Sequence, residues 1–301
     1  MLGQNRPILT ILTVGALVAL TGCGETTEPR AKDQRNYENG DAGTTTAQDA
    51  GTPDAGESQN TACKPDRLVF LGDSIPGCTG VGGKEGPQCG PKVLFNYVKE
   101  NINPDVTYEN LAVPGAVTED VATEQIFEIT EGSESVLVIL YAGGNDLQPY
   151  IFASDDRANS AFAALQPEVE GHWRDTFAHL NDQEKFSGRM EMIINKQFNP
   201  FDDCTASPYN VTPRKSELLR DFNNVVSDLA DEEENVHVAD QYTPFLGHGH
   251  HYRVQSCPNY VADSEYWMVG GLDLVHPNGL GHASIANVWQ NLVDEIYKDC
   301  N

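Results

Sequence analysis

Short apolar runs alternate with helix-like segments along most of this chain, and this alternation limits the possible folds more than any other feature. Runs rich in Val, Ile and aromatic residues are typical of buried parallel strands. They occupy residues 67–71, 106–113, 135–141, 190–195 and 236–240. Strands and helices that alternate in this way predict an α/β domain, with a doubly wound sheet of five parallel strands and helices on both faces.

The helices are predicted from spacing and capping. One begins at Thr212-Pro213, because threonine is a good N-cap and proline fits the first helical turn. Its apolar side chains recur at helical spacing and should face the sheet. They are Leu218, Leu219, Phe222, Val225, Val226 and Leu229. Another helix is expected over residues 279–298. Residues 156–183 also have a helical pattern, which indicates core packing, with a wall of a substrate pocket as the alternative.

The first 22 residues have the pattern of an export signal. Arg6 is followed by an apolar run from Ile8 to Leu20, which is too short to span a bilayer and typical of a signal peptide. The run ends in Leu20-Thr21-Gly22-Cys23, which resembles the lipobox of bacterial lipoproteins and implies lipidation of Cys23. An ordinary cleaved signal followed by a chance cysteine is the alternative.

Residues 23–62 are predicted to be a disordered, acidic tether. They repeat Asp-Ala-Gly at 41–43, 49–51 and 54–56, and Tyr37 is their one strongly apolar or aromatic side chain. Such a segment cannot bury enough surface to offset its ordering entropy. The folded domain is therefore expected over residues 63–301. The lipid anchor would hold it in the cell envelope, and Gly24 after the cysteine, rather than aspartate, favours the outer membrane.

The formal net charge of the chain is −26. A strongly acidic surface repels nucleic acid and anionic lipid headgroups. We therefore expect no nucleic-acid partner, no membrane contact except through the lipid anchor, and a neutral or cationic substrate.

Six cysteines follow Cys23, and an even number in an exported chain indicates three disulfides. Sequence alone leaves fifteen pairings open. We favour Cys78–Cys89 around a glycine-rich loop, Cys204–Cys257 between two late loops, and Cys63–Cys300 between the ends of the domain. A zinc site is the alternative, but the sequence contains no CxxC pair.

Segments that are polar, glycine-containing or both follow four of the five predicted strands. They are Gly72-Asp73-Ser74, Pro114-Gly115, Gly143-Gly144-Asn145-Asp146 and, after a long loop, Asp273-Leu274-Val275-His276-Pro277. In open parallel sheets, sites form outside the carboxyl ends of the strands. We expect all four segments to meet at one edge of the sheet.

Together these segments contain the groups that acyl transfer requires. Ser74 supplies a nucleophilic hydroxyl, His276 can accept its proton, and Asp273 can orient the imidazole. The backbone N–H groups of Ser74 and Gly115 and the side-chain amide of Asn145 could stabilise an oxyanion.

The four segments also resemble the sequence blocks of the SGNH hydrolases, or GDSL esterase/lipase family: "GDS" at 72–74, "NLAVPG" at 110–115, "GGND" at 143–146 and "DLVHP" at 273–277. The resemblance implies a flavodoxin-like three-layer α/β/α sandwich and serine-dependent ester hydrolysis without a cofactor. It implies Ser74 as nucleophile, Asp273 and His276 as the other triad members, and Gly115 and Asn145 as oxyanion donors. Ile75 stands where the family has leucine.

Three alternatives remain open. The loop from Gln241 to Gly270 is rich in aromatic residues and is similar to late loops that form the acyl pocket in secreted lipase-like members of the family. Because aromatic side chains also stack on sugars, a carbohydrate O-acetyl esterase is the alternative. A non-catalytic ligand-binding lipoprotein could keep the same fold. His248, His250 and His251 could bind a metal, although a solvated or substrate-facing loop is favoured because no carboxylate or thiolate has a convincing spacing.

Overall fold

The computed structural model describes residues 63–300 of the chain, except residues 152, 208 and 210. The predicted signal peptide, Cys23 and the predicted tether lie outside the described residues. None of the helices in the described part is both long enough and apolar enough to span a membrane.

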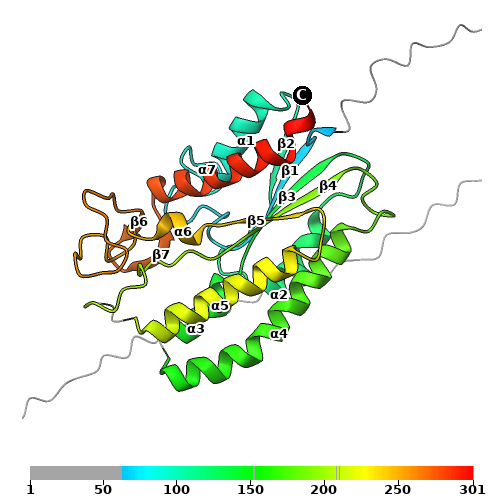
Figure 1. Ribbon diagram of the computed structural model, residues 1–301. Helices are drawn as coiled ribbons and strands as arrows, with labels where there is room; N and C mark the ends of the chain where they lie inside the picture. The colour runs from blue at the N-terminus through cyan, green and yellow to red at the C-terminus, as the bar shows by residue number, and fades with distance from the viewer. Residues whose placement is uncertain (1–62, 152, 208, 210, 301) are drawn as a thin grey trace, which may run out of the picture. The chain divides into compact units, whose positions relative to one another are not determined.

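A sheet of five parallel strands forms the centre of the domain (Figure 1). The strands are β1 Arg67–Gly72, β2 Thr107–Asn110, β3 Val136–Tyr141, β4 Met190–Asn195 and β5 Val236–Ala239. Their order in the sheet is β2-β1-β3-β4-β5, and each neighbouring pair is parallel. This is the doubly wound order of flavodoxin-like folds. The predicted α/β fold with five parallel strands is confirmed.

Helices cover both faces of the sheet (Figure 1). The longer elements are α1 Gly90–Asn101, α3 Gly144–Ile151, α4 Asp155–Leu180, α5 Pro213–Ala230 and α7 Gly279–Ile296. The shorter ones are α2 Thr118–Thr123, α6 Tyr242–Phe245, and the 3-10 turns η2 Gln125–Glu128 and η3 Lys298–Cys300. Helices α1 and α7 pack together on one face, and α2, α4 and α5 pack on the other.

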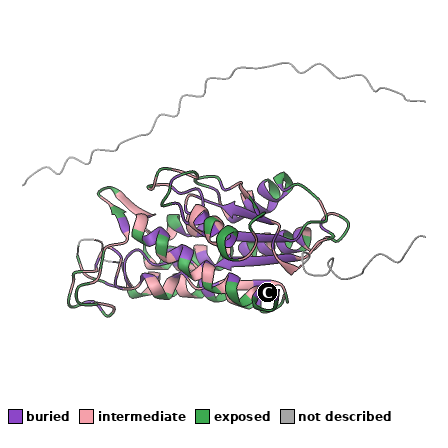
Figure 2. Ribbon diagram, turned by 90° about the horizontal axis from the view of Figure 1, so that it is seen from above, coloured by how far each residue is buried: buried purple, intermediate pink, exposed green. Residues whose placement is uncertain are grey.

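Alternate side chains of each central strand enter two separate cores. Val69 and Leu71 of β1 pack in the core that contains Trp173 of α4, whereas Leu68 and Phe70 pack in the core that contains Trp289 of α7. All six residues of β1 are buried, as are all those of β3 and β4 (Figure 2). Burial on both faces explains why these strands are mostly apolar in the sequence, with Arg67 of β1 and Glu191 and Asn195 of β4 as the exceptions.

Two sequence expectations need correction in detail. The strand predicted over 106–113 is shorter, because β2 ends at Asn110, although Leu111 and Val113 still donate to the carbonyls of Phe70 and Gly72 (both 2.9 Å). Helix α5 starts at Pro213 as predicted, but the Thr212 hydroxyl makes no capping bond and donates instead to Asp155 Oδ1 (2.8 Å).

Three disulfides are present, Cys63–Cys300, Cys78–Cys89 and Cys204–Cys257, which are the pairs favoured from the sequence. The first joins the segment before β1 to η3.

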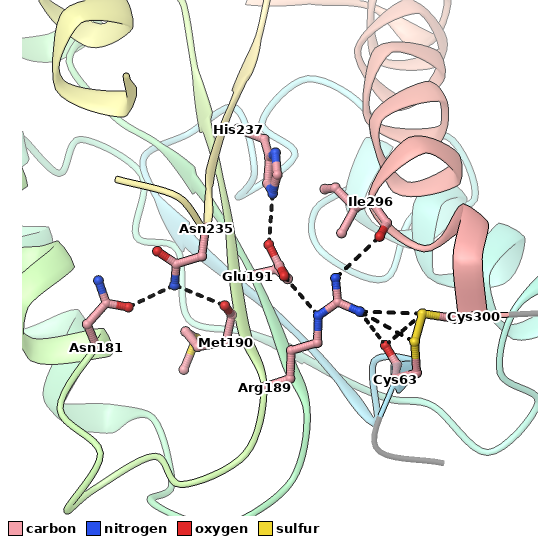
Figure 3. A network of polar contacts seen from close by, with 9 residues as sticks. All are labelled: Cys63, Asn181, Arg189, Met190, Glu191, Asn235, His237, Ile296 and Cys300. Atoms are coloured by element: carbon pink, nitrogen blue, oxygen red, sulfur yellow. Dashed lines mark hydrogen bonds and ion pairs between the residues drawn. A yellow bond between two sulfur atoms is a disulfide. The ribbon is translucent and has the colours of Figure 1, made fainter. Parts of the chain in front are cut away.

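Arg189 reinforces this junction at the amino-terminal end of the sheet (Figure 3). Its guanidinium donates to the Glu191 carboxylate (2.8 Å) and to the carbonyl oxygens of Cys63 (2.8 Å) and Ile296 (3.3 Å). Glu191 also contacts Nε2 of His237 on β5 (2.8 Å). The two ends of the domain are therefore held together at the edge opposite the carboxyl ends of the strands.

Candidate active site

Ser74 follows the carboxyl end of β1, at the edge where the polar segments were expected to meet. The strand ends at Gly72, whose φ of +133° is rare for other residues, and a Cβ there would lie 2.0 Å from the carbonyl oxygen of Tyr141. The chain then turns, with Gly77 N–H donating to Asp73 O (3.0 Å) and Thr79 N–H to Ser74 O (3.0 Å). Glycine is required at position 72 because β1 must pass this close to β3 before the chain reaches the serine.

Ser74, His276 and Asp273 form one hydrogen-bonded chain of side chains. Nε2 of His276 lies 2.9 Å from the Ser74 hydroxyl oxygen. Nδ1 of His276 lies 2.9 Å from Oδ2 and 3.0 Å from Oδ1 of Asp273. An ionised carboxylate only accepts hydrogen bonds, so this contact assigns the proton of the neutral imidazole to Nδ1. Nε2 is then free to accept from the serine hydroxyl, and the arrangement can move a proton from Ser74 to His276.

Asp273 is held in its ionised form by its own loop. Burial raises the pKa of its carboxyl, but the backbone N–H groups of His276 and Val275 and the imidazole of His276 outweigh this effect and bring the pKa below its ordinary value. The N–H bonds measure 3.0 Å from His276 and 3.2 Å from Val275, and both reach Oδ1. The carboxylate therefore stabilises a positive charge that forms on the imidazole.

The sequence places Asp273 and His276 in a loop, but the structure places them in a short strand, β7 Asp273–Pro277, paired antiparallel with β6 Met268–Gly270. Asn278, which sequence reasoning missed, joins this hairpin to α7. Its amide donates to the carbonyls of Tyr266 (2.8 Å) and Met268 (3.0 Å), and its Oδ1 accepts from the first N–H groups of α7. Asparagine directly before a predicted helix is a typical N-cap and could have indicated this role.

The predicted oxyanion donors belong to three parts of the chain, namely the turn after β1, the Pro114-Gly115 segment and α3. Among the described residues, neither the Ser74 N–H nor the Gly115 N–H donates to another protein group. Asn145 on α3 donates through Nδ2 to the carbonyl of Ala116 (2.9 Å), which ties α3 to the Gly115 loop and leaves the second amide hydrogen available. Ser74 and Asn145 line the same cleft. An N–H group without a protein acceptor is available to donate to a negatively charged substrate oxygen.

Two buried carboxyl groups support this edge of the sheet. Burial raises the pKa of Asp73 to about 7. The N–H of Ile75 lowers this pKa, and the negative charge of nearby Asp146 raises it further. Burial also raises the pKa of Asp146, whose carboxylate accepts from the hydroxyl (2.8 Å) and the N–H (3.1 Å) of Thr118. Asp146 thereby fastens the start of α2 to α3, a role that the sequence did not indicate.

An apolar cleft extends from Ser74 between α3, α5 and the segment after β4. Its apolar lining includes Ile75, Phe198, Phe201, Val211, Leu218 and Leu219. The expectation that the aromatic loop 241–270 forms the acyl pocket is wrong, because no residue of that loop lines this cleft within the described chain. Helix α4 does not line it either, and its Phe162, Trp173 and Phe177 are core residues, as the sequence indicated.

The three histidines of the late loop each bind the protein itself. His248 stacks on Trp267 at 3.7 Å, His250 contacts Leu274 O (3.0 Å) and Tyr266 OH (3.0 Å), and His251 lies buried between the carbonyls of Phe201 (3.0 Å) and Ala206 (2.9 Å). The described residues contain no group of three or more His, Cys, Asp or Glu side chains arranged to hold a metal ion. His251 is buried, contrary to the favoured interpretation of a solvated or substrate-facing loop, whereas His248 and His250 remain partly exposed.

Comparison with known proteins identifies a family and a fold. Residues 70–284 match the GDSL-like Lipase/Acylhydrolase family. Comparison with curated protein sequences found no match.

Several solved structures have a similar fold. Phospholipase A1 from Streptomyces albidoflavus NA297 has a TM-score of 0.52 and 16% identity, covering 75% of this chain and 99% of that one. The extracellular lipase from Streptomyces rimosus has a TM-score of 0.51 and 15% identity, covering 75% and 98%. The acetylxylan esterase Axe2 from Geobacillus stearothermophilus has a TM-score of 0.52 and 17% identity, covering 77% and 96%.

Proposed function

Because the chain belongs to the GDSL-like lipase/acylhydrolase family and is an ester-hydrolysing enzyme, we propose that it cleaves carboxylic esters with Ser74, His276 and Asp273 as its catalytic residues. The observation that carries this proposal is the continuous contact from Asp273 through both nitrogens of His276 to the Ser74 hydroxyl. No metal or cofactor enters the proposed reaction.

In the first half-reaction, Ser74 Oγ attacks the ester carbonyl carbon while His276 Nε2 takes the hydroxyl proton. The negative oxygen that forms is stabilised by the N–H groups of Ser74 and Gly115 and by the amide of Asn145. The intermediate then expels the alcohol, which takes the proton from His276. In the second half-reaction, His276 deprotonates a water molecule that attacks the acyl group on Ser74, and the acid leaves as the serine regains its proton.

The cleft beside Ser74 favours an apolar acyl chain as the part of the substrate that it holds. Five of its lining side chains, Ile75, Phe198, Phe201, Val211 and Leu218, are buried and apolar. Each buried methylene contributes about 0.8 kcal/mol, or roughly fourfold in binding. An acetyl group would leave most of this lining unused, so we propose esters of longer acids as substrates.

We expect kcat/KM for p-nitrophenyl esters to rise by at least about tenfold from acetyl to octanoyl, because the added methylenes enter the apolar cleft. The measurement is initial rates for the ester series from acetyl to palmitoyl. Leu219→Trp is the matched variant, since a larger side chain on the cleft wall should lower turnover of the longer esters and spare the acetyl ester.

A clear preference for the acetyl ester would contradict the acyl-cleft proposal and favour a carbohydrate O-acetyl esterase. Acetylxylan esterases are among the solved structures with this fold. The absence of hydrolysis for every ester, with Ser74 also unreactive toward an organophosphonate, would favour a non-catalytic binding protein.

We further propose that the folded domain spans residues 63–301 and is exported and lipid-anchored through Cys23. Support comes from the lipobox-like Leu20-Thr21-Gly22-Cys23 and from the three disulfides, which are typical of oxidising compartments. In a bacterial host, the full chain should incorporate radiolabelled palmitate and fractionate with membranes, and Cys23→Ser should abolish both.

Gly24→Asp is the matched control for the lipidation experiment, because it leaves the cysteine in place. It should keep the label and change only the membrane in which the protein is found. Label retained in Cys23→Ser would contradict the anchor.

A further inference from the structure

Three exposed apolar side chains belong to segments that carry candidate active-site residues. The large apolar residues that are exposed in the described chain are Val113, Phe127, Val261, Val269, Leu272 and Leu280. Leu272 is exposed over its full surface (102%), and Val113 and Val269 are exposed by 53% and 40%. Val113 directly precedes the Pro114-Gly115 segment, and Val269 and Leu272 belong to the β6–β7 hairpin.

The hairpin holds these side chains at the rim of the site. Gly270 (φ +85°) and Gly271 (φ +71°) form the tight turn, and Leu272 at its end directly precedes Asp273. A Cβ built on Gly80 would lie 2.6 Å from Val269 Cγ2 and 3.8 Å from His276 Cβ, so both side chains border the same point. Val269 therefore lies beside His276, and Leu272 is the chain neighbour of Asp273.

Residues 266–272 of the hairpin contain no charged side chain, although the chain is strongly acidic. Residues 266–277 contain a single ionisable acid or base other than Tyr266 and His276, namely Asp273, and its carboxylate is engaged by the imidazole of His276. The whole chain has a net charge of −26. The negative charge of the chain would attract a cationic partner to other parts of its surface. The uncharged, apolar turn of the hairpin instead fits a partner whose own surface is uncharged and apolar.

The hairpin that carries Val269 and Leu272 also contributes to the cleft. Val275 of β7 lines the cleft beside Ser74, and Leu272 precedes the same strand. An ester molecule that leaves a lipid aggregate for Ser74 would pass its acyl chain over this rim. Contact between the aggregate and Leu272 would therefore shorten the distance over which the acyl chain is exposed to water.

We propose that the rim formed by Val113, Val269 and Leu272 docks the enzyme on the surface of aggregated, uncharged lipid esters. This inference rests on the proposed ester hydrolysis and adds the physical state of the substrate. Leu272 enters the droplet surface, and the ester then reaches Ser74 through the cleft. Loss of the leucine side chain should weaken droplet binding about tenfold or more.

The test compares tributyrin below and above its solubility limit. The wild-type rate should rise above the limit, and Leu272→Ser should lower the rate on the emulsion about tenfold while the rate on dissolved tributyrin stays within twofold. Leu272→Met should retain the wild-type behaviour. Phe127→Ser is the matched control, because Phe127 is 63% exposed but lies on η2, against His179.

A binding measurement separates docking from catalysis. Ser74→Ala protein should sediment with droplets of trioctanoin, and Ser74→Ala/Leu272→Ser protein should not. Droplet binding without any ester hydrolysis by the wild type would overturn the proposed function and support the docking surface.

Several results would overturn the docking proposal. An equal loss on dissolved and emulsified ester in Leu272→Ser would mean that the residue only supports Asp273. Unchanged rates on both would mean that the rim does not contact the droplet. A concentration-dependent dimer that disappears in Leu272→Ser would assign the rim to a second copy of the chain.

Discussion

Replacing Ser74 with alanine is expected to lower kcat for ester hydrolysis by about a million-fold, the loss typical when the nucleophile of a serine hydrolase is removed. The substitution deletes a single oxygen, whose contact in the structure is the 2.9 Å bond to His276 Nε2. The cleft and the oxyanion donors remain, so substrate should still bind. The measurement is kcat and KM on the best p-nitrophenyl ester.

Ser227→Ala is the matched serine control. Ser227 lies half-buried on α5, where its hydroxyl donates to Asn223 O (3.2 Å), and it makes no contact with the site. We expect it to keep wild-type kcat. Hydrolysis by Ser74→Ala within tenfold of wild type, in protein with an unchanged melting temperature, would rule out Ser74 as the nucleophile.

Asp273→Asn should lower kcat by about ten-thousand-fold and leave KM nearly unchanged. The reason lies in which oxygen is already occupied. Oδ1 of Asp273 accepts the N–H groups of Val275 and His276, so an asparagine would keep its oxygen there and place its NH₂ group against Nδ1 of the imidazole. The imidazole would then carry its proton on Nε2 and could not accept the proton of Ser74.

Asp273→Ala is informative beside it, because it removes the carboxylate without adding a donor toward Nδ1. Its loss should be smaller than that of Asp273→Asn if the tautomer is the main effect. Asp263→Asn changes an exposed carboxylate in the preceding loop and should have wild-type rates. A fall of less than tenfold in Asp273→Asn would show that Asp273 serves only to shape its loop.

The fold could be predicted because its signals are local. The strands β1, β3 and β4 are buried on both faces, and each appears in the sequence as a short run of mostly apolar residues. The turns after β1 and β3 contain glycine, and the structure shows the steric reason at Gly72. Strand order and site location then follow from the general behaviour of parallel sheets. The meeting of Ser74 with His276, 202 positions apart in sequence, is a consequence of that topology.

The cleft and the hairpin could not be predicted in this way. The cleft wall is assembled from the segment after β4, the start of α5 and α3, so that no single stretch has a pattern that indicates it. Strand β6 has three residues, which is too short for an alternating pattern to be recognised, and it pairs with β7 through an irregular register. Its aromatic neighbours suggested a pocket wall instead.

The role of His248, His250 and His251 also could not be predicted from the sequence. A metal site needs imidazoles close together, but histidines that are close in sequence can also each make separate contacts with the protein, and sequence cannot tell these two cases apart. The structure separates them through Asp202, a buried carboxylate that accepts the N–H groups of Gly247 (2.9 Å), Gly249 (2.8 Å) and His251 (2.8 Å). Those bonds fix the loop around a residue 45 or more positions earlier in the chain, which local spacing does not reveal.

The junction of Cys63, Cys300 and Arg189 has a practical consequence for handling the protein. Both ends of the folded domain leave from the amino-terminal edge of the sheet, whereas Ser74 and the cleft lie beyond its carboxyl ends. A solid support, reporter protein or affinity tag joined before Cys63 or after Cys300 is thus attached at the edge farthest from the reaction. Immobilised preparations made through either end should keep the mouth of the cleft facing the solution.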